Sequence, residues 1–206
     1  MSKTKSALLN TLGLFFLFYG VYAIDYSVYR DHWSWVFWIC YIGLVIMGAA
    51  ILLRNSMVII SQLYILTIPL LIWLTDFFSR VFTGHHWFGT TDYFFEELLL
   101  PARIISLEHF FLLPLGYVAF WALGAKAKGA WVISIIEVAV IYFMVRLFTD
   151  AVQNVNCVFE SCFPSVPSDA LYPIRWFAII LGMILITWFL NFMVLYLTKK
   201  INYNKK

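Results

Sequence analysis

The sequence predicts an all-α integral membrane protein, a polytopic bundle of six transmembrane helices with a short interfacial helix in the third connection. Three observations support this class. Hydrophobic residues make up 63% of the 206-residue chain and charged residues 12%, whereas soluble domains average about 45–50% and about 25%. Apolar runs recur at the length of roughly 20 residues that crosses a bilayer. None of these runs alternates polar with apolar residues, as the strands of a membrane barrel do.

The first three predicted spans cover residues 7–24, 33–53 and 57–75. Each is expected to be helical, because a segment in lipid must satisfy its own backbone hydrogen bonds. The first span is at the upper length limit for a signal-peptide core, and no good small-residue cleavage site follows it, so we interpret it as a retained span. Only residues 54–56 separate the second span from the third, which predicts a tight hairpin.

The last three predicted spans cover residues 104–123, 130–148 and 174–197. Pro114 lies inside the fourth span and predicts a kink, because proline cannot donate to the helix ladder. The chain contains no linker, low-complexity tract or convincing repeat, so residues 1–206 are predicted to form one domain.

The distribution of basic residues over the predicted connections indicates the topology. Nine lysines and arginines fall on the side of both termini and four on the other side. Cytoplasmic loops are enriched in these residues, so we expect both termini to be cytoplasmic and the protein to lie in a bacterial cytoplasmic membrane. The same placement explains the net charge of +3 without nucleic acid, and membrane lipids are the expected partners. Residues 25–32, 76–103 and 149–173 then face outward.

Two segments with histidines are predicted to supply the reactive groups of the outer face. The sequence FTGHHWFGTTDYFFEELLL, residues 82–100, is the least membrane-like stretch and contains His85 and His86. Glu108 and His109 lie about one turn into the fourth span, in ISLEHFFLLPLGY. Ionisable groups in a span usually face the bundle interior or a watery cavity, and a carboxyl group beside an imidazole suits general acid–base chemistry. The alternative is a glutamate that simply reaches water at the interface.

A short helix is predicted after the loop that contains His85 and His86, which we call the histidine loop. Thr91 or Asp92 is expected to cap it, and it is expected to run through Leu100 and to stop at Pro101. Its aromatic and aliphatic residues predict that it lies on the outer membrane interface.

Two arginine–aspartate pairs have helical spacing at the outer ends of spans. Asp76 and Arg80 are four residues apart, and so are Arg146 and Asp150. If the helices extend this far, each pair lies on one helix face and forms a structural ion pair. The alternative is that one arginine binds an anionic head group or carboxylate, for which the guanidinium fork is suited.

The last outward loop contains two asparagines and two cysteines, and the sequence allows two interpretations for each pair. Asn154 and Asn156 either donate hydrogen bonds into the site or make local turn bonds. Cys157 and Cys162 lie on the expected oxidising side, where they form a disulfide or remain two free thiols. Cys40, in the second span, is interpreted as a packing residue.

No cofactor is expected from the sequence. Residues of the types that bind zinc are present on the outer side, but their spacing matches no HExxH or cysteine-rich pattern, so a metal ion is not favoured. The ligands considered are His85, His86 and His109, with one carboxylate from Asp92, Glu96 or Glu108.

Glu137 lies deep in the fifth span, nearer its cytoplasmic end. A buried carboxylate there is expensive unless it is protonated or paired. It either serves ion coupling or holds helices together, with Asn191, Asn10 or Thr11 as expected partners.

The segments FTGHHWFGTTDYFF, ISLEHFFLLPLGY and RLFTDAVQNVNCVF, about the middle third of the chain, resemble a family of small bacterial integral membrane proteins. The shared features are a GTTxY loop, an SLxH helix start and an NxNxVF loop. The resemblance implies a multi-span membrane protein with His86, His109, Asn154 and Asn156 as positions of interest, and it implies no activity. Family members often have tryptophan where this chain has Cys157, so a disulfide would be particular to this protein.

We expect a membrane-embedded enzyme that acts on a lipid or lipid-linked substrate at the outer leaflet. The alternatives are a non-enzymatic accessory or binding protein and, third, a small transporter. The predicted catalytic residues are His109, Glu108, His86 and His85, and the predicted substrate-binding residues are Arg146, Arg80, Asp76, Asp150, Asn154 and Asn156.

Overall fold

The computed structural model describes residues 2–96, 99–163 and 165–203, and every secondary-structure element in that part of the chain is helical. The predicted all-α class is therefore confirmed. The elements are α1 (Lys3–Tyr29), η1 (Trp33–Phe37), α2 (Ile39–Leu52), α3 (Ser56–Thr83), α4 (Asp92–Glu96), α5 (Leu100–Ser106), α6 (Glu108–Ala122), α7 (Ala130–Phe148), η2 (Val155–Cys157) and α8 (Tyr172–Tyr203).

Five helical segments among the described residues are long and apolar enough to cross a membrane. They are α1, α3, α5 with α6, α7, and α8 up to Thr198. The predicted second span differs, because α2 is an apolar helix of only 14 residues. Trp38 has an extended conformation, with φ −59° and ψ 125°, and it separates α2 from the 3₁₀ turn η1. Residues 33–53 are thus not one continuous helix.

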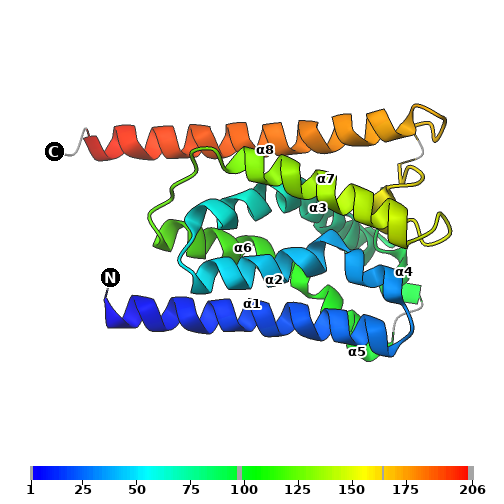
Figure 1. The fold of residues 1–206 in the computed structure, drawn as a ribbon, viewed down its shortest axis with the longest axis horizontal. Helices are drawn as coiled ribbons and strands as arrows, with labels where there is room; N and C mark the ends of the chain where they lie inside the picture. The colour runs from blue at the N-terminus through cyan, green and yellow to red at the C-terminus, as the bar shows by residue number, and fades with distance from the viewer. Residues whose placement is uncertain (1, 97–98, 164, 204–206) are drawn as a thin grey trace.

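The two ends of the bundle have different connections. Both chain termini lie at one end, together with the short turns between α2 and α3 and between α6 and α7 (Figure 1). The three longer connections lie at the opposite end, which we call the loop end: residues 30–38, 84–99 and 149–171, without residues 97–98 and 164, which the structure does not describe. The polar groups of three separate connections are therefore brought to one end of the fold.

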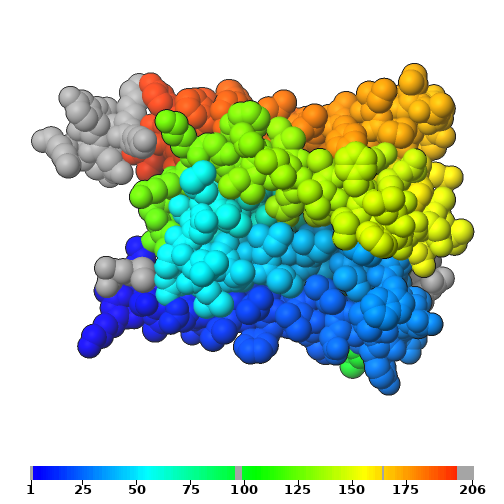
Figure 2. All heavy atoms as spheres, viewed as in Figure 1, coloured from blue at the N-terminus to red at the C-terminus, as the bar shows by residue number. Residues whose placement is uncertain are grey.

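The centre of the bundle is α3, which packs against α2, α6, α7 and α8. Its middle turns are almost completely buried; Ile60 and Leu63 have no exposed surface. A second close contact joins α1 to α2, where a Cβ added at Gly48 would lie 2.6 Å from the Leu17 nitrogen. Small residues allow such approach of two helices in lipid. α1, α2 and α7 follow one another across the face seen in Figure 2.

The short helix predicted after the histidine loop is two elements in the structure. α4 ends at Glu96, and Pro101 lies in the first turn of α5 instead of stopping a helix. Proline is tolerated there because the first turn uses no intrahelical N–H donor. Residues 97–98, which the prediction included, are outside the described residues, as are Lys205 and Lys206 of the basic side.

The loop of residues 149–171, predicted to face outward, contains a disulfide between Cys157 and Cys162, which decides between the two interpretations of these cysteines. Reduction is expected to lower the stability of the protein by about 2 kcal/mol, because a short cross-linked loop restricts the unfolded chain. Thermal unfolding of the detergent-purified protein with and without reductant measures this difference. A variant with serine at both positions is the control and should not respond to reductant. Two free thiols in the unreduced wild type would contradict the assignment.

Candidate functional site

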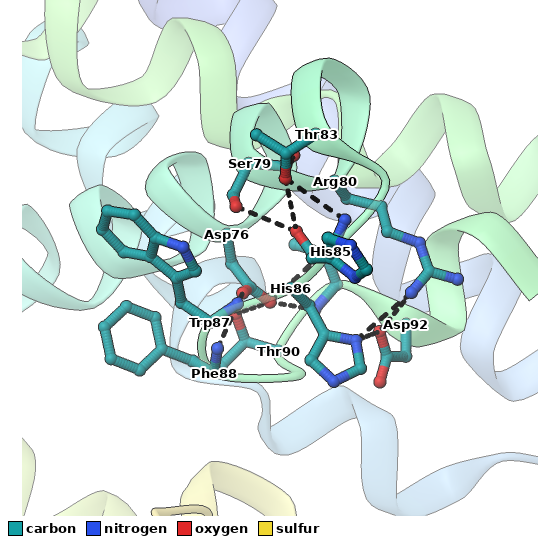
Figure 3. A network of polar contacts seen from close by, with 11 residues as sticks. Asp76, Ser79, Arg80, Thr83, His85, His86, Trp87, Phe88, Thr90 and Asp92 are labelled. Carbon is teal, nitrogen blue, oxygen red and sulfur yellow. Dashed lines mark hydrogen bonds and ion pairs between the residues drawn. The ribbon is translucent and has the colours of Figure 1, made fainter.

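The histidine loop is folded around Asp76, whose side chain is completely buried (Figure 3). Its Oδ1 accepts hydrogen bonds from the backbone N–H groups of Trp87 and Phe88, both at 2.8 Å. Its Oδ2 accepts from the Thr90 hydroxyl and from both the N–H and the hydroxyl of Thr91, each at 3.1 Å. All the strong acceptor positions of this carboxylate are used inside the loop. Asp76 therefore organises the backbone and is not available to a substrate.

Arg80, His86 and Asp92 form a partly exposed group next to this loop, which we call the outer triad. The Nδ1 of His86 lies 2.8 Å from Oδ1 of Asp92 and 3.2 Å from the guanidinium of Arg80. Arg80 itself lies 3.7 Å from the same Asp92 oxygen. Arg80 thus pairs with Asp92, and the i, i+4 pairing expected with Asp76 does not occur, because Asp76 turns toward residues 87–91. His85 is exposed, and its carbonyl accepts from Ser79 at 2.8 Å.

Cys40, Glu108 and His109 form a second group, which we call the buried cluster. One ligand-type atom from each of the three side chains lies within 4.8 Å of the other two. Glu108 and His109 are the first residues of α6, and Cys40 is the second residue of α2. Two helices therefore begin at this point, and the positive ends of helix dipoles favour negatively charged groups.

The ring of His109 is held in one orientation. Its Nδ1 lies 2.8 Å from the backbone carbonyl of Ser106, to which a protonated Nδ1 donates. One face of the ring stacks on Trp73, with 4.2 Å between centroids. The Trp73 indole in turn donates to the Tyr93 hydroxyl at 2.9 Å. With the proton on Nδ1, the lone pair of the imidazole is on Nε2, the nitrogen that can act as a base or bind an ion.

Glu108 is a side chain of the buried cluster that lacks hydrogen-bond partners. It has no exposed surface, and neither carboxylate oxygen has a hydrogen-bond partner. Its Oε1 lies 3.9 Å from Nδ1 of His109. Buried polar groups in proteins are nearly always hydrogen-bonded, and the exceptions concentrate at functional sites. The alternative that Glu108 reaches water is wrong for this fold, because α5 and the neighbouring helices enclose the start of α6.

The break between η1 and α2 is held by the last outward loop. Asn156 accepts from the N–H of Ile39 at 3.1 Å and donates to the carbonyl of Phe37 at 2.8 Å. Both backbone groups lie at the break, so Asn156 holds the chain immediately before Cys40. Asn154 instead makes local bonds, since its Oδ1 accepts from the N–H groups of Phe159 and Glu160 at 3.0 Å. Neither amide side chain enters the buried cluster.

The remaining predicted binding residues lie elsewhere at the loop end. α7 ends at Phe148, so Asp150 is off the helix and does not pair with Arg146 as expected. Asp150 accepts from the N–H of Gln153 at 3.1 Å. The guanidinium of Arg146 lies over the ring of Phe159, 4.8 Å from its centroid, on the exposed surface.

Glu137 is paired within the bundle, with Gln62 of α3 in place of the three partners considered from the sequence. The Gln62 amide donates to Glu137 Oε2 at 2.5 Å, while Oε1 has no partner. Glu137 also lines a shallow groove of about 310 Å³ between α2 and α7, whose other lining residues are apolar. Because this second oxygen has no donor among the described residues, the Glu137–Gln62 pair is the feature of the fold that favours ion coupling.

Three residues in or next to the buried cluster were not identified as candidates from the sequence: Cys40, Trp73 and Tyr93. A cysteine and a tryptophan in apolar spans have no local pattern that separates packing from function.

Of the candidate metal ligands, Glu108 and His109 are together, whereas His86 and Asp92 belong to the outer triad and the Glu96 side chain is outside the described part. The residues that could hold a metal ion are therefore Cys40, Glu108 and His109.

The long apolar helices are consistent with an integral membrane protein, and the side chains of Cys40, Glu108 and His109 meet between them. No protein-family model matches the chain, no curated protein matches it, and no solved structure matches it. Its function is therefore inferred from the geometry of the buried cluster and the outer triad.

Proposed function

We propose that this protein is a membrane-embedded enzyme that acts on a lipid or lipid-linked substrate, with the buried cluster as its reactive centre. The observation that supports this most directly is the Glu108 carboxyl group. It is fully enclosed, has no hydrogen-bond partner, and lies beside an imidazole and a thiol. Leaving a buried polar group unpaired costs about 1–3 kcal/mol, and an active site is a common reason for a fold to retain that cost.

The proposed topology has six crossings, with η1 and α2 together forming the second. The 3₁₀ turn and the α-helix cover residues 33–52, which is about the length that a span requires. The loop end is the extracytoplasmic face and both termini are cytoplasmic. The Cys157–Cys162 disulfide at the loop end supports this orientation, because disulfides persist in oxidising compartments. α4 lies at the interface in this arrangement, in a bacterial cytoplasmic membrane of the kind that the family resemblance implies.

A lipid substrate fits the surroundings of the cluster. The outward faces of the long helices are apolar, so a membrane lipid can approach them without leaving the bilayer. Glu108 and His109 then exchange protons with the reacting group, as a carboxyl group and an imidazole commonly do in general acid–base catalysis. Arg80 of the outer triad and Arg146 are placed at the loop end, where lipid head groups lie in this topology. A guanidinium binds a phosphate or carboxylate with two parallel hydrogen bonds.

The test is mass spectrometry of lipids incubated with the reconstituted protein. Wild-type protein in vesicles of total bacterial lipid should change the abundance of at least one lipid species. Glu108→Gln and His109→Gln should slow that change by about 100-fold or more, the usual contribution of a general acid or base. Glu160→Gln, on the exposed part of the last outward loop, is the matched control and should leave the rate unchanged.

Two results would contradict the enzyme proposal. One is an unchanged lipid composition with well-folded wild-type protein. The other is an activity that requires Glu137 and a membrane potential but tolerates both Glu108→Gln and His109→Gln. That second result would favour transport, which the Glu137–Gln62 pair supports.

A further inference from the structure

The Glu108 carboxyl group has no lysine or arginine as an ion-pair partner in the part of the chain that the structure describes. It has no exposed surface, and both oxygens are without a hydrogen-bond partner. A buried carboxylate is stable only if it binds a proton or lies next to a cation. The one ion-pair contact that it makes among the described residues is with Nδ1 of His109, which lies 3.9 Å from its Oε1. Its charge is therefore balanced either by a bound proton or by a cation from outside the chain.

The three side chains of the buried cluster are a matched set of metal ligands. A thiolate, an imidazole and a carboxylate are the donors found in zinc sites, and a sulfur donor disfavours magnesium and calcium. Ligand atoms around a tetrahedral zinc ion are about 3–4 Å apart. The atoms of Cys40, Glu108 and His109 lie within 4.8 Å of one another, so a contraction of about 1 Å brings them to bonding distance.

The charge of the cluster suits a divalent ion in an apolar environment. A thiolate and a carboxylate together carry two negative charges, and a neutral imidazole carries none. A divalent cation makes the whole cluster neutral, which removes the penalty for burying charge among membrane helices. Both anionic ligands also lie in the first turn of a helix, where the helix dipole favours negative charge.

The hydrogen bond that orients the His109 ring is of the kind found at metal-ligating histidines. Such a histidine usually donates from its second ring nitrogen to a carbonyl or carboxylate, which fixes the tautomer. In this structure Nδ1 faces the Ser106 carbonyl at 2.8 Å, and Trp73 holds the plane of the ring. Nε2 keeps a free lone pair, although the nitrogen that lies 3.9 Å from Glu108 Oε1 is Nδ1. The cluster thus has its ligands, their charge balance and the support of its histidine.

We infer that Cys40, Glu108 and His109 bind one divalent transition-metal ion of the zinc type. Three protein ligands leave a fourth coordination position for water or a substrate oxygen, which is the arrangement of catalytic zinc sites. The inference deepens the proposed enzyme function, on which it depends for the role of the site. With the ion in place, Glu108 and His109 would be its ligands, and a water in the fourth position would replace them as the proton-transfer group of the proposed enzyme. The binding of the ion itself is measured without any assay of activity.

Metal content and cobalt spectra test the inference. Protein purified through a metal-free affinity tag should contain about one zinc-class ion per chain by inductively coupled plasma mass spectrometry. After chelation, titration with Co²⁺ should produce a thiolate-to-cobalt absorption band that saturates at one equivalent. Cys40→Ser should abolish that band, and Glu108→Gln should weaken Co²⁺ binding by at least about 10-fold. Glu160→Gln and a variant with serine at both Cys157 and Cys162 are controls that should bind normally.

The outcomes separate this inference from the proposed function. No ion in the purified protein and no binding of added Zn²⁺ or Co²⁺ would overturn the inference. Binding that survives both Cys40→Ser and Glu108→Gln would also overturn it, because the ion would then lie elsewhere. Lipid conversion by a metal-free protein refutes the metal site and retains the enzyme. One bound ion without any lipid conversion retains the metal site and refutes the enzyme. Monodisperse elution of each variant verifies that it is folded.

Discussion

Glu108→Met will stabilise the metal-free protein, although the same change will remove its activity. Methionine has a similar length and no buried oxygens, so the variant avoids the penalty of about 1–3 kcal/mol for an unsatisfied buried group. Glu108 also lies in the first turn of α6, where a carboxylate gains about 0.3–1 kcal/mol from the helix dipole. The penalty exceeds this gain. Thermal unfolding in detergent with a chelator present should therefore show a higher midpoint for the variant.

The order of stabilities should reverse when zinc is added. A ligand at 100 times its dissociation constant stabilises the folded state by about 2.7 kcal/mol, and only the wild type has all three ligands. Glu137→Met is the matched control, because Glu137 already has a partner in Gln62. That change should lower stability by leaving the Gln62 amide unpaired. A Glu108→Met variant less stable than wild type in chelator would show that the carboxyl group has a partner after all.

Asp76→Ala will have the largest effect on the loop end. The change removes the acceptor of five hydrogen bonds at 2.8–3.1 Å and leaves three backbone N–H groups of the histidine loop unpaired. Hydrogen bonds to a charged group contribute about 1.5–3 kcal/mol each, and such contributions are not fully additive. We expect a loss of about 3 kcal/mol or more in stability. The amides of residues 87, 88 and 91 should also exchange their hydrogens faster with solvent.

The Asp76→Asn variant removes the negative charge of the side chain and keeps its shape. One amide oxygen can still accept from the N–H groups of Trp87 and Phe88, while the amide NH₂ group would face the Thr91 N–H donor. Its effect should therefore lie between those of wild type and alanine. Asp150→Asn is the control, because Asp150 is exposed and accepts a single backbone bond from Gln153. Equal hydrogen exchange at residues 87–91 in wild type and Asp76→Ala would refute this role.

Much of the fold follows from composition and run length. The apolar runs near residues 7–24, 57–75, 104–123, 130–148 and 174–197 correspond to long helical segments, although the helices extend further than the runs. Helix length is poorly predicted because the loop-end turns of α3 continue up to Gly84, well beyond the apolar core of the span. The second run was misjudged for another reason. The break at Trp38 depends on Asn156, more than a hundred residues later in the chain.

Two of the three residues of the buried cluster, Glu108 and His109, are candidates from the sequence alone. Glu108 and His109 are recognisable because ionisable residues in an apolar run are conspicuous. Asp76 and Asn154 looked similar to them in sequence, but in the structure they satisfy backbone groups of their own loops. A polar side chain beside a turn has both options, and its sequence neighbourhood is the same in each case. Whether it serves the loop or a ligand depends on which donors the folded backbone presents to it.

The amino-acid sequence is sufficient to show that this chain forms long apolar helices, because helix formation in lipid is imposed locally by backbone hydrogen bonding. It is also sufficient to show that ionisable groups begin the fourth apolar run. The meeting of Cys40 with Glu108 and His109, by contrast, appears only once α2 packs beside α6. Contacts between distant helices arise from the packing of whole surfaces, and no local pattern around a single cysteine encodes them.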